Sequence, residues 1–596
     1  MVLRSLYELY DRLVEDPEYG IAPSGFSYQR VSFVVVVEPD GSFYALQDAR
    51  VQAGTMFRAR KVLVPGGAKK TGSGLNPCFM WDNSAYLLGY DPDKRERAIR
   101  TFEAFREQHL RLEAELDLAP YSAVCRFLEY WSPDEAYRHE ILAEVGRGFG
   151  VFQIRGETRF VHDHARIREW WEAGLAAECD EPAGQCSVTG LVAPLARLHP
   201  SIKGVAGAQP TGAAMVSFNL GSYESYGKTQ SFNAPVSVRA AERYTTALNA
   251  LLDGPRRDKH RLVVGDCTVA FWTDRPSVIE DVFLDFASKG SGSPKGAGAQ
   301  DEVLREKLEA FLRALRRGRE AYGDIEESPD ATGYYLLGLS PNAARIVVRF
   351  FHEGTLVHLL ENLRLHFSDI GIERQWGDAS KHPDPEFPPV DLLLRQTARE
   401  SKDILPVLGG LVLHAVVGGG PYPATLFQAV MRRIAADRLI NYPRACVIKG
   451  YLVRNLEREV PVSLDGSRED PAYRLGRLFA VLEKTQADAL GGGINSTIRD
   501  RFYSSASTTP AAVFPRLLRT YQHHLAKLET GRKISREKLV QDVLDPIESF
   551  PAHFVLQDQG LFALGYYHQM NDLFRSREDR ASNADLDASP AGRTNE

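Results

Sequence analysis

The chain has 596 residues, with 72 Lys and Arg against 78 Asp and Glu, and a formal net charge of −6. At roughly 150 residues per domain, this length predicts about two to four domains, each large enough to bury its own core. The composition, 44% hydrophobic and 25% charged, excludes a largely disordered chain, and the slightly acidic total argues against a general nucleic-acid coat protein.

The cysteines and the apolar segments indicate the compartment. Six cysteines in 596 residues are too few for a disulfide-stabilised scaffold. The N-terminal segment has a helical apolar rhythm interrupted by charges, unlike the continuous apolar core of a signal peptide. The most apolar stretch, residues 404–420, contains a proline, a histidine and five glycines, so it falls short of the ~20 apolar residues of a membrane span. We expect a soluble, cytoplasmic protein without a membrane partner.

The first half of the chain mixes strand and helix patterns. A β-rich run at 28–37, the turn Glu38-Pro-Asp-Gly41 and an alternating run at 42–46 predict a hairpin. Further β-rich runs lie at 261–273, 334–339 and 344–351. Apolar spacing of three and four predicts helices at 3–14, 95–116 and 301–322. This mixture predicts an α+β domain with antiparallel sheets.

Two segments interrupt these patterns. Residues 288–300 (SKGSGSPKGAGAQ) have no apolar periodicity and predict a flexible insertion, and the proline-rich residues 374–389 predict a linker. After the linker, helices are expected at 424–439, 444–456, 473–489, 511–528 and 535–547. We therefore predict an α+β domain at 1–373, a C-terminal α-helical bundle at 390–574 and a disordered tail at 575–596.

Two glycine-rich segments carry uncharged polar residues at high density. In 202–249, glycines would let backbone N–H groups approach a phosphate, amides suit base edges, and Tyr223 and Tyr226 can stack on an unpaired base. The second segment is VPGGAKKTGSGLNPCFMWDN at 64–83; it is not a nucleotide P-loop, because Ser73 stands where the lysine is required. The alternative for both segments is structural, either tight packing of small residues or a solvated loop.

Charge is unevenly distributed along the chain. Between Arg432 and Lys538, 20 Lys and Arg stand against 11 Asp and Glu, a net of +9, so the remainder carries −15. This composition is typical of a groove along a nucleic-acid backbone, with Tyr503, Tyr521 and His523 as possible stacking platforms. The alternative is a charged, solvated helix face. The cations are Arg432, Arg433, Arg438, Arg444, Lys449, Arg454, Arg499, Arg501, Arg516, Arg519 and Lys527.

No pattern in the sequence indicates catalysis. Cys179 and Cys186 lack the second close pair that is usual at a zinc site. His162, Asp163 and His164 suggest a metal-dependent hydrolase, but such a site needs further ligands that the sequence does not place, and a surface turn is the simpler interpretation. We predict no catalytic residue, no metal and no cofactor.

The chain resembles the Csd family, the large subunit of the type I-C CRISPR surveillance complex Cascade, in several long motifs. They begin with VTGLVAPLARLHPSIKGVAGAQPTGAAMVSFNLGSYESYGKTQSFNAPVS, YTTALNALL and GDCTVAFWT. The resemblance continues in Gly72–Asn83, YYLLGLSPNAARIVVRFF, RACVIKGYLVRN, YRLGRLFAVLEKTQ and NSTIRDRFYSSASTTPAAVFPRLL. It therefore covers nearly the whole chain, in order.

The resemblance implies a subunit without catalytic chemistry in a crRNA-guided antiviral complex. Such a subunit recognises the protospacer-adjacent motif on double-stranded DNA, promotes R-loop formation, guides the displaced strand and supports recruitment of a helicase-nuclease. The implied partners are the crRNA-bearing backbone and foot subunits of Cascade. A further partner is a small subunit, which in this family is also made by internal translation of the same gene.

Under this resemblance, the polar residues of the two glycine-rich segments become candidate contacts to the motif. They are Lys69, Lys70, Thr71, Ser73, Asn76, Lys203, Gln209, Ser217, Asn219, Tyr226, Lys228, Gln230 and Asn233. The displaced strand is expected on Arg432, Arg433, Arg444, Lys449, Arg454, Arg499 and Arg501. Two alternatives stay open: a metal-dependent CRISPR nuclease acting through His162, Asp163 and His164, and a structural scaffold without direct DNA contact.

Overall fold

The computed structural model divides the chain into two compact units. The first contains Met1–Ile202 and Ala214–Arg256, and the second contains Lys203–Ala213 and Arg257–Glu596. The structure describes residues 2–53, 56–67, 69, 74–177, 182–277, 280, 310, 313, 331–376, 380–381, 383–491 and 496–574. The predicted insertion at 288–300, the predicted tail at 575–596 and nearly all of the predicted helix at 301–322 lie outside the described residues.

The first unit is built on a five-stranded sheet centred on β1 (Phe26–Val37). The four valines at 34–37 favour this strand because β-branched side chains fit a pleated surface. β1 and β2 form the predicted antiparallel hairpin, whereas β1 and β7 run parallel. The other strands of this sheet are β2 (Phe43–Asp48), β5 (Arg60–Pro65), β6 (Trp81–Asn83) and β7 (Phe149–Ile154). Two short pairs stand apart, β3 (Val51–Ala53) with β4 (Met56–Arg58) and β8 (Ala183–Gln185) with β9 (Val192–Pro194).

Helices cover one face of this sheet. Phe33 and Val35 point into a core that also contains Phe105 and Phe127 of two covering helices. The first helix on this face is the short α2 (Ser84–Leu88). It begins after Asn83, whose side chain accepts hydrogen bonds from two backbone N–H groups of the opening turn. The helices are α2 (Ser84–Leu88), α3 (Arg95–Leu116), α4 (Ala119–Tyr130), α5 (Pro133–Ala136), α6 (Glu140–Val145) and α7 (Ala165–Ala177).

The predicted N-terminal helix is α1 (Val2–Glu15), which packs against α8 (Val238–Asp253). Leu6, Leu9 and Leu13 are buried at a spacing of three and four, as expected for an amphipathic helix. Between β9 and α8 the chain is irregular and contains two short 3₁₀ turns, η2 (Gly221–Tyr223) and η3 (Gln230–Asn233). Most of the predicted motif contacts lie in this irregular segment.

The second unit joins a four-stranded antiparallel sheet, in the order β10–β11–β12–β13, to a series of helices. The β-rich run predicted at 261–273 forms two strands, because Gly265 adopts φ +64° and turns the chain between them. Val269, Phe271 and Leu336 of this sheet share one continuous core with the helices that follow. The strands are β10 (Arg261–Val264), β11 (Cys267–Thr273), β12 (Gly333–Asn342) and β13 (Arg345–Thr355).

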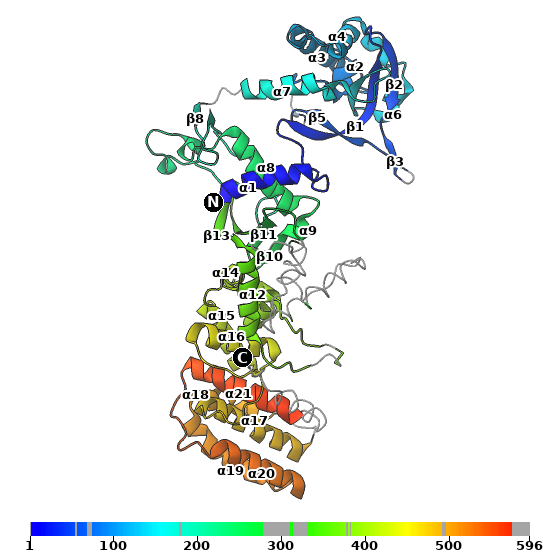
Figure 1. The fold of residues 1–596 in the computed structure, drawn as a ribbon. Helices are drawn as coiled ribbons and strands as arrows, with labels where there is room; N and C mark the ends of the chain where they lie inside the picture. The colour runs from blue at the N-terminus through cyan, green and yellow to red at the C-terminus, as the bar shows by residue number, and fades with distance from the viewer. Residues whose placement is uncertain are drawn as a thin grey trace, which may run out of the picture. The chain divides into compact units, whose positions relative to one another are not determined.

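From residue 390 onward the described residues form helices and no strand, as predicted. α17 packs along α21 and also contacts α18, α19 and α20 (Figure 1). Gly476 and Gly565 lie where α17 and α21 meet, and a side chain at either position would overlap with the backbone of the facing helix. The helices of the second unit are α9 (Arg257–His260), α12 (Leu356–Ile370), α13 (Val390–Leu394), α14 (Leu408–Gly418), α15 (Ala424–Asp437), α16 (Tyr442–Leu456), α17 (Pro471–Leu490), α18 (Ile498–Thr508), α19 (Pro510–Leu525), α20 (Thr530–Leu544) and α21 (Leu556–Phe574). Within the described part of the chain, every helix is too short or too polar to cross a lipid bilayer.

The compact units do not follow the division predicted at 374–389. The sheet and the C-terminal helices share a core, so residues 257–574 fall into one unit. Described residues around the predicted linker bond to the helices: Tyr442 Oη donates to Pro385 O at 2.9 Å, and Tyr567 Oη donates to Glu373 O at 2.7 Å. The sequence boundary therefore marks a change of secondary structure inside one packed unit.

Candidate nucleic-acid interface

Residues 220–234, which we call the Tyr226 loop, carry a tight turn at their exposed tip. Lys228 N donates to Ser225 O at 3.0 Å, and the same two residues form an isolated antiparallel bridge. Between them, Tyr226 and Gly227 have φ of 54° and 70°, values that match a type I′ turn. For a tyrosine this left-handed backbone costs roughly 1–2 kcal/mol. Because the Tyr226 side chain is 98% exposed, the turn presents an aromatic ring to solvent.

Side-chain amides predicted as DNA contacts hold this loop together. Asn233 Oδ1 accepts from Ser225 N at 2.9 Å, and Asn233 Nδ2 donates to Lys228 O at 2.7 Å and to Gln230 O at 2.9 Å. Gln230 Oε1 accepts from Arg197 at 3.0 Å. Both N–H groups of Asn233 are thus used inside the loop and leave no donor for a base edge. Lys228, in contrast, is exposed.

The remaining candidates of the 202–249 segment are divided between the two units. Lys203 and Gln209 are exposed and belong to the second unit. Ser217 is half-buried and Asn219 is exposed, and both belong to the first unit. Five of the predicted contacts in this segment, Lys203, Gln209, Asn219, Tyr226 and Lys228, therefore lie on the surface of their units.

The second glycine-rich segment uses its lysine internally. Lys69 Nζ lies 2.5 Å from Asp82 Oδ2, 2.5 Å from Asn76 O and 3.6 Å from the centroid of the Tyr86 ring. Burial raises the pKa of the Asp82 carboxyl, and the Lys69 ammonium opposes this shift. Lys69 therefore stabilises the glycine-rich segment through contacts within the first unit, contrary to its predicted role as a phosphate contact. Asn76 is exposed, and the predicted contacts Lys70, Thr71 and Ser73 lie outside the described residues.

Two of the seven cations predicted to guide the displaced strand, Arg444 and Lys449, are buried, and the side chain of a third, Arg454, is only 8% exposed. Arg444 pairs with Asp437 at 2.6 Å, and Arg454 pairs with Asp369 at 2.6 Å. Lys449 Nζ donates to Gly371 O at 2.5 Å. These three side chains cannot reach a nucleic-acid backbone in this structure, so their predicted role is corrected: they hold helices together.

The other four predicted cations differ in their surroundings. Arg433 pairs with Asp437 at 2.6 Å, and Arg499 lies 3.5 Å from Glu483. Arg432 and Arg501 are exposed, and neither forms an ion pair with a described residue. The predicted stacking residues Tyr503 and Tyr521 are buried at 2% and 3% exposure, which excludes them from stacking on a base.

An exposed stripe of three cations and one histidine follows α19. Its members Arg516, Arg519, His523 and Lys527 recur every three or four residues and so share one helix face, with Lys527 just beyond the helix end. α19 contains no aspartate or glutamate, and none of the four pairs with a described carboxylate. Arg516 lies over the ring of Phe502 of α18, 5.3 Å from its centroid. We call these four residues the α19 stripe.

The residues suggested for a metal centre do not assemble one among the described residues. His162 is 1% exposed, and its Nε2 lies 2.9 Å from the Leu63 carbonyl oxygen; burial lowers its pKa. His164 Nε2 lies 2.8 Å from Glu157. In the described part of the chain, no group of three His, Cys, Asp or Glu side chains could hold a metal ion.

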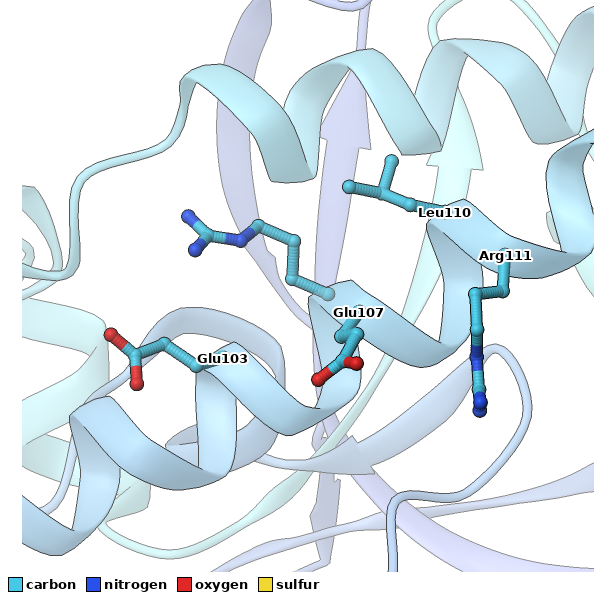
Figure 2. A pocket seen from close by; sticks show the side chains of 5 residues that line it. Glu103, Glu107, Leu110 and Arg111 are labelled. Carbon is cyan, nitrogen blue, oxygen red and sulfur yellow. The ribbon is translucent and has the colours of Figure 1, made fainter.

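A hollow of about 540 Å³ lies on α3 and is lined by Glu103, Arg106, Glu107, Leu110 and Arg111. Figure 2 shows that the labelled charged side chains point in different directions and do not converge on one point. The hollow is open and its lining residues carry both signs of charge, so it does not have the enclosed form of a small-molecule site.

The comparisons with known proteins identify one family. The family model described as CRISPR-associated protein (Cas_Csd1) matches residues 6–574, nearly the whole chain. Among the curated proteins, none matches the chain. The length of the family match agrees with the ordered motifs that extend from the first unit into the helices of the second. The chain belongs to the Csd1 family, the large-subunit family of the type I-C CRISPR complex Cascade.

Proposed function

We propose that this Cascade subunit recognises the protospacer-adjacent motif on double-stranded DNA and begins to separate the strands there. The single observation that carries the proposal is the Tyr226 turn, which holds a fully exposed aromatic ring on a left-handed backbone. Proteins that open or kink a duplex insert such side chains between base steps or stack them on an unpaired base. A strained, exposed tyrosine at a loop tip favours a functional role over packing.

The surroundings of Tyr226 suit the same task. Lys228, two residues further along the exposed tip, offers a charge to a phosphate. On the surface of the same unit, the exposed Asn219 carries an amide with the donor and acceptor atoms that base edges require. Few protein contacts to the motif suffice, because the guide RNA identifies the target by base pairing and the protein recognises only the adjacent motif. The net negative charge of the whole chain is compatible with this role, since it limits non-specific binding of the protein to DNA.

Equilibrium binding of the assembled complex to two duplexes tests this proposal. The duplexes carry the same target and differ only in the motif. Stacking of one base on an aromatic side chain contributes about 1–3 kcal/mol, so Tyr226→Ala should weaken binding to the motif duplex by roughly 5- to 150-fold. Tyr226→Phe should keep most of the affinity. Equal, small losses on both duplexes for Tyr226→Ala would argue for a scaffold without direct DNA contact.

We further propose that the displaced strand follows the α19 stripe, in place of the buried cations of α16. Exposed arginines at helical spacing, on a helix that itself contains no aspartate or glutamate, match a path for a phosphate backbone. Each phosphate contact to a single strand adds about 0.7 to the slope of log affinity against log salt. Replacing Arg516, Arg519 and Lys527 by glutamine should therefore reduce that slope by about 2. An unchanged slope would show that the displaced strand does not bind along the α19 stripe.

The subunit is proposed to act without catalysis of its own, to join the crRNA-bearing subunits and a small subunit, and to support recruitment of a helicase-nuclease. The nuclease alternative has a direct test on the purified protein. Cutting of DNA with Mn²⁺ or Ni²⁺ that is lost in His162→Ala would favour it. The burial of His162 argues against that result.

A further inference from the structure

Asn233 has an unusual position, because one side chain bonds both ends of the Tyr226 turn. Its Oδ1 accepts from the N–H of Ser225, where the turn begins, and its Nδ2 donates to the carbonyl of Lys228, where the turn ends. A second donation to Gln230 O connects the turn to η3. The two N–H groups and one acceptor lone pair of the amide are all engaged in the loop.

The segment that carries Asn233 is itself fixed to the first unit. Ser231 is 1% exposed, and Ser231 N donates to Arg197 O at 3.3 Å. Further along, Ala196 N donates to Val236 O at 2.8 Å. Asn233 therefore connects an anchored segment to the exposed turn, which is also closed by the backbone hydrogen bond from Lys228 N to Ser225 O and, just outside it, by the bond from Gln230 N to Glu224 Oε1 at 3.2 Å.

We infer that Asn233 is a positioning residue that keeps Tyr226 in its left-handed, outward conformation. This inference rests on the proposed function, since the value of a fixed Tyr226 lies in its contact with DNA. Tyrosine strongly prefers negative φ, so without Asn233 the turn should open and the Cα–Cβ bond of Tyr226 should lose its fixed direction. A turn whose backbone is fixed before binding loses less conformational entropy when Tyr226 meets DNA.

The first arm of the test contains no DNA. Backbone hydrogen exchange of Ser225 and Lys228 in the full chain should be roughly tenfold faster or more in Asn233→Ala, because several hydrogen bonds of the turn are lost together. Asn233→Asp keeps the acceptor for Ser225 N and loses both donors. Its exchange rate should therefore lie between the rates of the wild type and of Asn233→Ala. Asn249→Ala is a matched control, because the Asn249 side chain also donates to a loop carbonyl, that of Ser201, in the same unit; it should leave the turn unchanged. Unchanged exchange in Asn233→Ala would overturn the inference and would leave the proposed function untouched.

The second arm is a double-mutant cycle on the motif duplex with the assembled complex. If Asn233 acts through Tyr226, Asn233→Ala should weaken binding roughly three- to tenfold in the wild-type background and have almost no effect in the Tyr226→Ala background. Additive losses would overturn the inference in favour of a direct contact by Asn233. Fast exchange in the first arm together with no effect of Tyr226→Ala on binding would instead refute the proposed function, and with it the purpose assigned to Asn233.

Discussion

Replacing Arg454 by alanine tests whether the cations of α16 stabilise the fold or bind DNA. Its side chain is 8% exposed, its Nε donates to Asp369 Oδ2 at 2.6 Å, and its guanidinium lies 4.5 Å from the centroid of the Tyr422 ring. Arg454→Ala would leave the Asp369 carboxylate, itself only 16% exposed, without its cation. Breaking a buried ion pair in this way destabilises by about 3–5 kcal/mol. Since water reaches part of Asp369, we expect the lower end, about 3 kcal/mol.

This loss is measurable by thermal unfolding. At about 2 °C per kcal/mol for a large domain, the unfolding midpoint of the full-length protein should fall by roughly 6 °C. Arg432→Ala is the control, because Arg432 is exposed on the neighbouring helix α15 and pairs with no described carboxylate; its midpoint should change by less than about 1 °C. A stable Arg454→Ala variant whose salt dependence of DNA binding decreases would refute the buried placement of Arg454.

Three further predictions test other parts of the account. Gly476→Ala should lower the denaturant midpoint strongly, because the new methyl group would overlap with the Phe562 carbonyl; an unaffected midpoint would contradict the close approach of α17 and α21. Burial lowers the pKa of His109 to about 4. The stability that the neutral imidazole contributes is therefore complete above pH 6.5 and decreases as the pH falls toward 4. His109→Gln should make the free energy of unfolding less dependent on pH over that range, and an unchanged pH dependence would refute a buried, neutral His109. Lys69→Met should destabilise the first unit near neutral pH by leaving Asp82 buried without its cation, and Lys69→Met with Asp82→Asn should recover part of the loss.

The α+β character and many element positions could be predicted from the sequence, because they depend on local periodicity. The helix predicted at 95–116 is α3 with the same bounds, and the hairpin after residue 28 is β1 and β2. α21 gave no such pattern, because residues 560–569 are buried on all sides of the helix and the apolar residues form no stripe.

The candidate site was predictable only in part. Charge spacing identified the cations of the helical third, but it could not show that α16 is surrounded by other helices, with residues 442–450 all buried. Composition identified the Tyr226 loop and attributed its amides to DNA contact. The pairing of Asn233 with Ser225 and of Lys69 with Asp82 joins residues that are eight and thirteen positions apart, and only the folded chain determines these pairs.

The most direct test of the central claim is the rate at which the assembled complex opens the base pairs next to the motif. A 2-aminopurine in the first target base pair becomes fluorescent when it unstacks. The account predicts a rapid rise with the wild type, a similar rise with Tyr226→Phe, and a rise slower by roughly tenfold or more with Tyr226→Ala. Opening by Tyr226→Ala at the wild-type rate would contradict the claim that this exposed tyrosine separates the strands.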